Sequence, residues 1–387
     1  MKPRFRRRFG LVAAALLSVG LASVSTYQAA PAAQPPAKAK KNPHLKLIEP
    51  WPTAEALAKR RAESEALPLF SSEAPVEFTL AADFKAINKD RDPKSRTLYP
   101  ATLKVNGEDG AVKALPIQIR ARGHSRRLAR TCDYVPLRLE FQNKPLARGT
   151  VFARQEALKL VVQCAGGGDY RQYLLKEYLA YKIFNVVTPQ RSFRVRLATI
   201  NYVDKAGKAT GTRHGMLLED EGDVAKRMEG RIVELPRLMF KDVDMDTLMP
   251  MMIFEYMIGN TDYSIYALHN VRVVQRPDKT LHPIPYDLDY SGLVNTPYAR
   301  PARGIMIKSV TDRVYRGPCK RPEMIDPYVA NFNAKKDQIK ALPDTIPGLD
   351  RTNRDETKDY INSFFSSIKS PRDAKRVFVD CKEASLV

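Results

Sequence analysis

The sequence predicts an α+β protein with a β-rich N-terminal lobe over residues 51–220 and a mainly helical C-terminal lobe over residues 221–387. Short segments in which apolar and polar residues alternate follow one another before residue 165, as they do in half-buried strands. After the acidic run Glu219–Glu221 the sequence is mostly helical, with one further hairpin. Strands grouped in one half and helices in the other are typical of α+β proteins.

Residues 1–30 have the pattern of an export signal. Basic residues come first, the apolar run Leu11–Val24 follows, and the small-residue stretch Ala29–Ala33 comes last. The apolar run is too short to span a bilayer comfortably. The segment Arg6–Leu11 also resembles a twin-arginine signal, and an uncleaved N-terminal anchor is the alternative. Residues 31–50 are rich in Pro, Ala and Lys, so we expect a linker there.

Beyond this signal, no stretch approaches the ~20 apolar residues that a membrane helix needs. We therefore expect a periplasmic or secreted protein with no transmembrane span after signal removal. Lys and Arg number 64 against 43 Asp and Glu, and the net charge of +21 favours anionic partners. We do not expect nucleic acid among them, because aromatic residues do not alternate with the basic runs as a stacking platform requires.

Four cysteines in an exported chain permit two disulfides. Pairing within each region would join Cys132 to Cys164 and Cys319 to Cys381, and free buried thiols are the alternative. The spacing is too wide and too poor in histidine for a zinc site.

The folded part is expected to begin near Trp51, and its elements are bounded by turn residues such as Asn106–Gly110. In chain order we expect helix 54–66, strands 76–80, 101–105, 116–121, 136–141 and 157–162, helix 170–186, strands 193–203 and 214–218, helix 247–258, and strands 271–274 and 281–284.

Polar residues follow the apolar helix 247–258 in an order that indicates phosphoryl-transfer chemistry. The helix is apolar nearly all round, so the core positions the loop that ends at Asp262. A four-residue hairpin loop over Arg276–Lys279 would place Asn270 opposite Pro285 and close to Asp287. Amide and carboxylate oxygens at this open end of the hairpin would suit Mg²⁺, and Asp262 could orient an attacking hydroxyl.

The upstream half carries groups that could hold phosphates. Lys159 lies within an apolar strand and needs an anion, and Glu177 lies on an apolar helix face and needs a cation, so each is a sensible partner for the other. The run Arg120–Arg127 offers guanidinium groups and close backbone approach at Gly123. A structural ion pair and a solvated basic loop are the alternatives for these two features.

Together these segments resemble the CotH family of atypical exported kinases. The resemblance is carried by residues 120–125 and 158–160, the helix around Glu177, residues 214–221 and 259–262, His269–Asn270 and residues 285–289. Residues 176–183 and 284–289 look closest to a subgroup of exported bacterial proteins within that family. The resemblance implies a divergent two-lobed protein-kinase-like fold, ATP and Mg²⁺ or Mn²⁺ as cofactors, and phosphoryl transfer to a Ser or Thr hydroxyl.

By the same resemblance, Asp262 would be the catalytic base, Asp287 the principal metal ligand, and Asn270 and Asp289 the secondary ligands. Lys159 with Glu177 would hold the phosphates. The loop with Arg122, Gly123 and Ser125 would cover the phosphates, and Glu219 would lie near the adenine. The sequence departs from most kinases in having no Gly-x-Gly-x-x-Gly loop, no His-Arg-Asp triplet, and Leu288–Asp289 after Asp287.

Two functional hypotheses follow. In the first, the chain is an exported kinase that binds nucleotide and modifies a secreted or envelope protein. In the second, it is a non-catalytic envelope-binding or surface-assembly protein that uses its basic face on anionic material.

Overall fold

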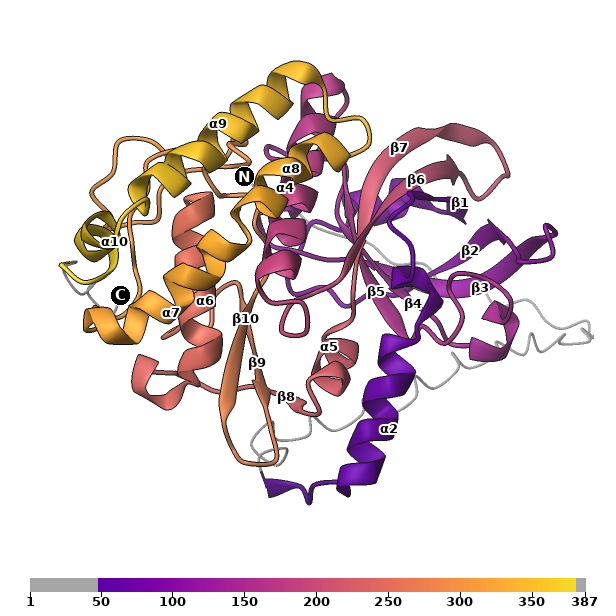
Figure 1. Cartoon of the computed structure of the whole chain (residues 1–387). Coiled ribbons are helices and arrows are strands. Elements are labelled where there is room, and N and C mark those ends of the chain that lie inside the picture. Colours follow the sequence, from indigo (N-terminus) through magenta and orange to yellow (C-terminus); the bar gives the residue numbers. More distant parts are fainter. Residues whose placement is uncertain (1–47, 381–387) are drawn as a thin grey trace, which may run out of the picture. The chain divides into compact units, whose positions relative to one another are not determined.

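Seven strands close into a β-barrel in the computed structural model, which describes residues 48–380. The order around the barrel is β1-β2-β3-β4-β5-β7-β6, and the parallel pairing of β1 with β6 closes it. In Figure 1 the barrel strands lie on the right and helices α6, α7 and α10 on the left. The strands are β1 (Val76–Ala82), β2 (Tyr99–Asn106), β3 (Val112–Ala121), β4 (Leu137–Glu140), β5 (Ala157–Val162), β6 (Val195–Val203) and β7 (Ala209–Leu218).

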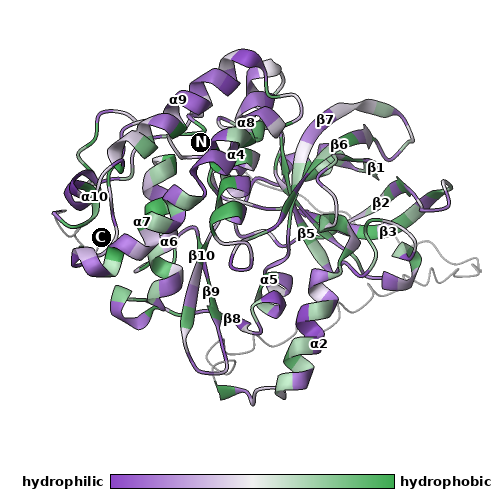
Figure 2. Ribbon diagram, in the orientation of Figure 1, coloured by the Kyte–Doolittle hydropathy of each residue, from purple (hydrophilic) through white to green (hydrophobic). Residues whose placement is uncertain are grey.

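Alternate residues of each barrel strand point inward and fill the barrel with side chains. In β1, for example, Val76 and Phe78 are buried, whereas Glu77 between them is exposed. The interior cluster includes Phe152 and residues from each of the seven strands, so this part of the barrel is a packed core. Figure 2 shows hydrophobic residues along the barrel strands, whereas the outer helix α9 (Arg351–Ser367) is largely hydrophilic.

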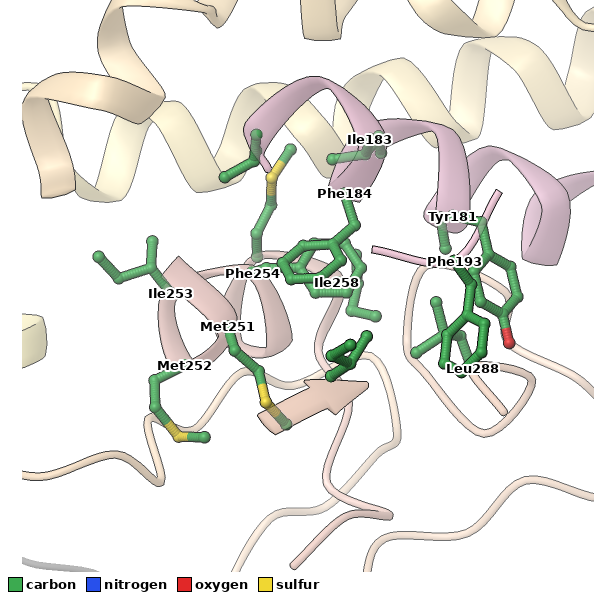
Figure 3. Packing of buried hydrophobic residues seen from close by; sticks show 14 of the residues in the cluster. Tyr181, Ile183, Phe184, Phe193, Met251, Met252, Ile253, Phe254, Ile258 and Leu288 are labelled. Atoms are coloured by element: carbon green, nitrogen blue, oxygen red, sulfur yellow. The ribbon is translucent and has the colours of Figure 1, made fainter. Parts of the chain in front are cut away.

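A second core lies among the helices. Helix α4 (Gly168–Val187) packs against α6 (Met245–Ile258), and the rings of Phe184 and Phe254 have centroids 4.5 Å apart (Figure 3). A three-stranded sheet in the order β10-β9-β8 flanks α6. The remaining elements are α2 (Ala54–Glu65), α3 (Phe84–Lys89), α5 (Glu221–Arg227), β8 (Arg231–Val233), β9 (Val271–Gln275), β10 (Leu281–Pro285), α7 (Pro322–Ala334), α8 (Lys336–Thr345) and α10 (Pro371–Phe378).

The predicted two-lobed kinase-like fold is wrong, because the structure has a closed, mixed seven-strand barrel with helices in place of a β-sheet lobe and a helical lobe. Alternation of apolar residues identifies a strand and its buried face, but it does not say which strand edges meet. The closing pair, β1 with β6, joins segments more than one hundred residues apart, such as Val76 and Ala198. The predicted domain boundary at residue 220 falls between β7 and α5 and stays a prediction.

The predicted register of the last hairpin is wrong by one residue. Gln275 pairs with Leu281 rather than with Thr280, and Val271 rather than Asn270 lies opposite Pro285. The loop has five residues because Asp278 accepts hydrogen bonds from the backbone and hydroxyl of Thr280, and Lys279 adopts a positive φ of 68°. This shift places Asn270 beside Tyr286, whose backbone N–H donates to the Asn270 carbonyl oxygen at 3.0 Å.

Two further predictions concern the ends of the chain. The predicted signal and most of the linker lie outside the described residues, as does Cys381. Cys319 is disulfide-bonded, and its predicted pairing with Cys381 stays a prediction. Within residues 48–380, no helix is both long and apolar enough to span a membrane. The predicted disulfide between Cys132 and Cys164 is confirmed, and it ties the loop before β4 to the end of β5.

Replacing both Cys132 and Cys164 with serine should lower the free energy of unfolding by roughly 3.5 to 4 kcal/mol. The bond closes a loop with a sequence separation of 32 residues, and a crosslink of this size restricts the unfolded chain by about that amount. Urea unfolding of the oxidised protein and of the double variant would measure the difference. Equal unfolding free energies would show that this crosslink does not stabilise the fold.

Candidate functional site

Three carboxylates converge beside the core: Glu177 on α4, and Asp287 and Asp289 in the segment after β10. Each offers one oxygen, and these oxygens lie within 4.8 Å of one another. Leu288 between the two aspartates is 1% exposed and belongs to the same buried cluster as Tyr181 and Phe193 (Figure 3). The core therefore holds the backbone that presents Asp287 and Asp289.

Arg126 bridges two of these carboxylates. Its Nη2 lies 2.6 Å from Glu177 Oε2, and its Nε lies 2.8 Å from Asp289 Oδ2. The Tyr298 hydroxyl donates a further hydrogen bond to Asp289 Oδ2 at 2.9 Å. Burial alone would lower the pKa of Arg126, but the charges of Asp289 and Glu177 raise that pKa well above its ordinary value. Arg126 thus remains a cation inside the protein.

The cluster nevertheless has more negative than positive charge. Three carboxylates face one guanidinium, and Glu177 Oε1 is buried without a hydrogen-bond partner. Burial and the carboxylates of Asp289 and Asp287 raise the pKa of Glu177 to about 7, against the lowering effect of Arg126. A divalent cation would balance the two excess charges and use the unpartnered oxygen. The residues fit Mg²⁺ or Mn²⁺, which prefer carboxylate oxygens.

Asp287 is held by its backbone. Its φ of 64° lies in the left-handed region, which aspartate tolerates better than most residues. Its backbone N–H donates to the buried Tyr181 hydroxyl at 2.8 Å. Its half-buried carboxylate makes no hydrogen bond or ion pair with any other residue of the described range. Asp287 is therefore the carboxylate of the cluster whose charge is least neutralised by partners, and it is also the most exposed of the three to a ligand.

Lys159 and Glu177 do not form the expected pair. The Lys159 ammonium group contacts the Glu221 carboxylate, and it lies 4.7 Å from the centroid of the Tyr286 ring. Pairing of β5 with β7 sets Lys159 opposite Leu218, three residues before Glu221 in the chain, while Arg126 occupies Glu177. Burial lowers the pKa of Lys159 to about 8 although Glu221 raises it, so the ammonium is easily deprotonated for a lysine.

Glu221 also binds a second cation. Its Oε1 lies 2.8 Å from Arg272 Nε. Burial would raise the pKa of Glu221, but Lys159 and Arg272 lower it to about 2, so this carboxylate is ionised at neutral pH. The Lys159–Glu221–Arg272 network therefore has a net positive charge beside the Tyr286 ring.

The predicted phosphate loop follows β3. Arg122 is half-buried, and its positive charge helps to lower the pKa of Lys159, which places the two cations near each other. No partner for the Arg122 guanidinium occurs among residues 48–380. Gly123 is exposed with a φ of 85°, and Ser125 begins the 3₁₀ turn Ser125–Arg127 that directs Arg126 into the carboxylate cluster.

Asp262 is presented by a tightly fixed turn. Its N–H donates to Asn260 Oδ1 at 2.9 Å, and Arg316 Nη1 donates to the carbonyl oxygens on either side, of Thr261 and Tyr263. Gly259 before the turn has a φ of 64°, and a Cβ there would collide with the Tyr360 hydroxyl. The position after α6 thus requires glycine.

Two neighbours orient the Asp262 carboxylate. His269 Nε2 lies 3.1 Å from Oδ1, and Asn270 Nδ2 donates to Oδ2 at 3.1 Å and to the backbone carbonyl of Asp262 at 2.7 Å. The hydrogen bond to Asp262 raises the pKa of His269, and the charge of Asp287 adds to this effect. His269 therefore lies close enough to both Asp262 and Asp287 for their charges to act on it. The amide nitrogen of Asn270 is engaged with Asp262, and its role as a metal ligand stays a prediction.

Glu219 has a different environment from the one expected near adenine. It is fully buried, and its two carboxylate oxygens accept hydrogen bonds from Arg194 and Arg227 and from the Arg194 backbone N–H. These contacts join β7 to α5 and to the chain before β6. Because both oxygens are occupied, Glu219 acts as a structural ion-pair residue in this structure.

Sequence reasoning missed three residues of the site: Arg126, Tyr181 and Arg316. Arg126 was treated as one of several guanidinium groups of a basic run, and only burial distinguishes it from Arg122. A signal did exist for Tyr181, since it lies four residues after Glu177 on the same apolar helix face. Nothing in the local sequence points to Arg316.

No model of a known protein family matches the chain, and no match to it was found among curated proteins. The function has to be argued from the residues of the site.

Replacing Glu177 with glutamine should flatten the pH dependence of stability in a solution with a metal chelator. A carboxyl with a pKa of about 7 in the folded protein and 4.5 ordinarily binds more protons when folded, so the protein loses stability as pH rises between these values. The loss attributable to Glu177 should be up to about 3 kcal/mol.

Urea unfolding at pH 4.5 and pH 7.5 would measure the effect in the wild type and in Glu177→Gln. The exposed Glu63→Gln on α2 is the matched control and should follow the wild type. A Glu177→Gln variant that loses as much stability as the wild type over this range would contradict the assignment of the raised pKa to Glu177.

Proposed function

We propose that the chain is an exported, CotH-like phosphotransferase that moves the γ-phosphoryl group of ATP to a Ser or Thr hydroxyl of a secreted or envelope protein. The observation that supports it is the carboxylate cluster, with an unpartnered buried oxygen on Glu177, close to cations that could bind phosphate. A catalytic site of this kind works mainly by positioning and charge stabilisation.

We assign roles in metal and phosphate binding to the site residues according to their charges. Glu177, Asp287 and Asp289 would hold Mg²⁺ or Mn²⁺, which when bound would neutralise phosphate charge. Arg122 would bind phosphate oxygens with its unpaired guanidinium, and Lys159 would add positive charge nearby. Asn270 and His269 would keep Asp262 oriented rather than take part directly.

The proposed reaction uses Asp262 as the proton acceptor. The hydroxyl oxygen of the acceptor forms a bond to the γ-phosphorus as the bond from that phosphorus to ADP breaks, and the hydroxyl proton passes to the Asp262 carboxylate. Hydrogen bonds from Asn270, and from His269 when its Nε2 carries a proton, leave one lone pair free on each carboxylate oxygen to accept this proton.

One observation favours the non-catalytic alternative, an envelope-binding or surface-assembly protein. The Lys159 ammonium contacts Glu221 and is not directed at Glu177, so a phosphate would have to compete for it. Nucleotide binding separates the two hypotheses, since a scaffold has no need of a metal-dependent nucleotide site.

Replacing Asp287 with asparagine should remove metal-dependent ATP binding and leave the fold intact, because asparagine also tolerates a positive φ and keeps the backbone N–H that bonds to Tyr181. At ATP about 100 times its dissociation constant, the wild type should gain roughly 2.7 kcal/mol of stability in Mg²⁺. Thermal-shift titration with ATP, with and without Mg²⁺ or Mn²⁺, measures this. The exposed Asp337→Asn on α8 is the matched control. Equal metal-dependent shifts in Asp287→Asn and the wild type would remove the metal assignment.

Replacing Asp262 with asparagine should separate binding from catalysis. The variant should keep the Mg²⁺-dependent ATP shift and lose phosphoryl transfer by a factor on the order of 10² to 10⁴, as expected when a general base is removed. Transfer of radiolabelled phosphate to a mixture of envelope proteins, or to the chain itself, gives the readout. Undiminished transfer in Asp262→Asn would exclude Asp262 as the proton acceptor, and absence of any nucleotide shift in the wild type would favour the scaffold.

A further inference from the structure

A cavity of about 530 Å³ lies at one end of the barrel and shares no lining residue with the carboxylate cluster. At this end β1 and β6 finish, β4 and β7 begin, and the turn Asp204–Ala206 and helix α3 form the rim. None of the candidate site residues described above lines it. Its volume falls in the range of small-molecule sites, and barrel mouths are common places for them.

Aromatic side chains form its walls. Phe84 and Tyr202 pack edge to face with ring centroids 4.7 Å apart, and Tyr134 from the loop before β4 also lines the cavity. Leu137 closes the floor and belongs to the barrel core. These surfaces suit a flat apolar body that can stack on the rings.

Two cations of the lining, Arg213 and the exposed Lys85, form no ion pair within the part of the chain that the structure describes, and Arg213 is the less exposed of the two. The Arg213 guanidinium lies 3.2 Å from the centroid of the Tyr134 ring, and it has no hydrogen bond or ion pair with any residue between 48 and 380. Because the ring contact leaves the guanidinium N–H groups without acceptors, they can bind an anionic group directly.

The acidic groups of the lining are already engaged. Asp83 accepts from the Ala86 backbone at the start of α3 and pairs with Lys205 at 3.0 Å. Asp204 accepts two backbone N–H groups within its own turn. With its carboxylates occupied and Arg213 unpaired, the cavity favours an anion over a cation.

The wall that carries Tyr134 is fixed before any ligand arrives. Tyr134 lies two residues after Cys132, which is joined to Cys164 after β5. Arg91 donates hydrogen bonds to the carbonyl oxygens of Cys132 and Asp133 at 2.9 Å each. A cavity formed in advance loses less entropy when it binds a ligand.

We propose that this barrel-mouth cavity is a binding site for a small organic anion with a flat aromatic body and a carboxylate or sulfonate group. The Arg213 guanidinium covers one face of the Tyr134 ring, so the aromatic body packs against Phe84 and Tyr202 and the anionic group binds Arg213. This inference does not depend on the proposed phosphotransferase activity, because it involves neither nucleotide nor divalent cation.

The test uses 8-anilinonaphthalene-1-sulfonate as a fluorescent probe on the folded protein, without nucleotide or metal. We expect saturable binding that 2-naphthoate displaces and that the cation 2-naphthylmethylamine does not. Arg213→Met keeps the apolar stem and should weaken binding by roughly tenfold or more. Thr210→Trp places a large ring at the cavity rim and should abolish binding.

Arg237→Met is the matched control, because Arg237 also lies over a tyrosine ring, that of Tyr266, but outside the cavity. It should bind the probe as the wild type does. Binding unaffected by Thr210→Trp, or no saturable binding, would overturn the site. Loss in Thr210→Trp without any weakening in Arg213→Met, or equal displacement by the amine, would overturn its assignment to anions.

Discussion

The geometry of the candidate site depends on one buried guanidinium, that of Arg126. It joins the loop after β3 to α4 and to the segment after β10, across sequence separations of 51 and 163 residues. Without this cation, three carboxylates would face one another in a low-dielectric environment, where like charges cannot all stay ionised. With it, two are partly neutralised and Asp287 remains open. Arg126 is thus both the structural link between the barrel and the helices and the group that sets the charge left for a metal.

Backbone strain accompanies this electrostatic constraint. Asn270 and Asp287 both have positive φ values, 52° and 64°, and they flank the hairpin of β9 and β10 on the side that faces the site. The backbone N–H of Asp287 donates to the Tyr181 hydroxyl, and the side-chain amide of Asn270 donates to the backbone carbonyl of Asp262. Strained residues persist only where the surrounding structure determines their conformation. Here the buried core around Leu288 and α6 holds the backbone of these two residues in place. The acidic groups therefore do not depend on a ligand for their positions.

Local patterns predicted the elements well but not their assembly. The strand 157–162 and the helix around Glu177 lie close to their predicted limits, because alternation and helical periodicity act over few residues. Barrel closure depends on the pairing of β1 with β6, which no local pattern encodes. At the site, Asp287 and Asp289 were found because they are adjacent to a clear hairpin. The partner of Glu177 was not, because the arginines of residues 120–127 are chemically equivalent until the fold directs Arg126 to Glu177 and Arg127 to Asp90.

The candidate metal site and the barrel-mouth cavity are built from the same connection between β3 and β4. Arg126 lies near its beginning and Tyr134 near its end, with the Cys132–Cys164 bond between them in the chain. A ligand shifts a conformational equilibrium only if it binds two states with different affinity. Arg91 and the Cys132–Cys164 disulfide hold the segment before Tyr134 in one conformation. We therefore do not expect a ligand in the cavity to shift this loop between two conformations. The shared connection thus contributes residues to both proposed sites, and Arg91 and Cys164 hold the part of it that precedes Tyr134.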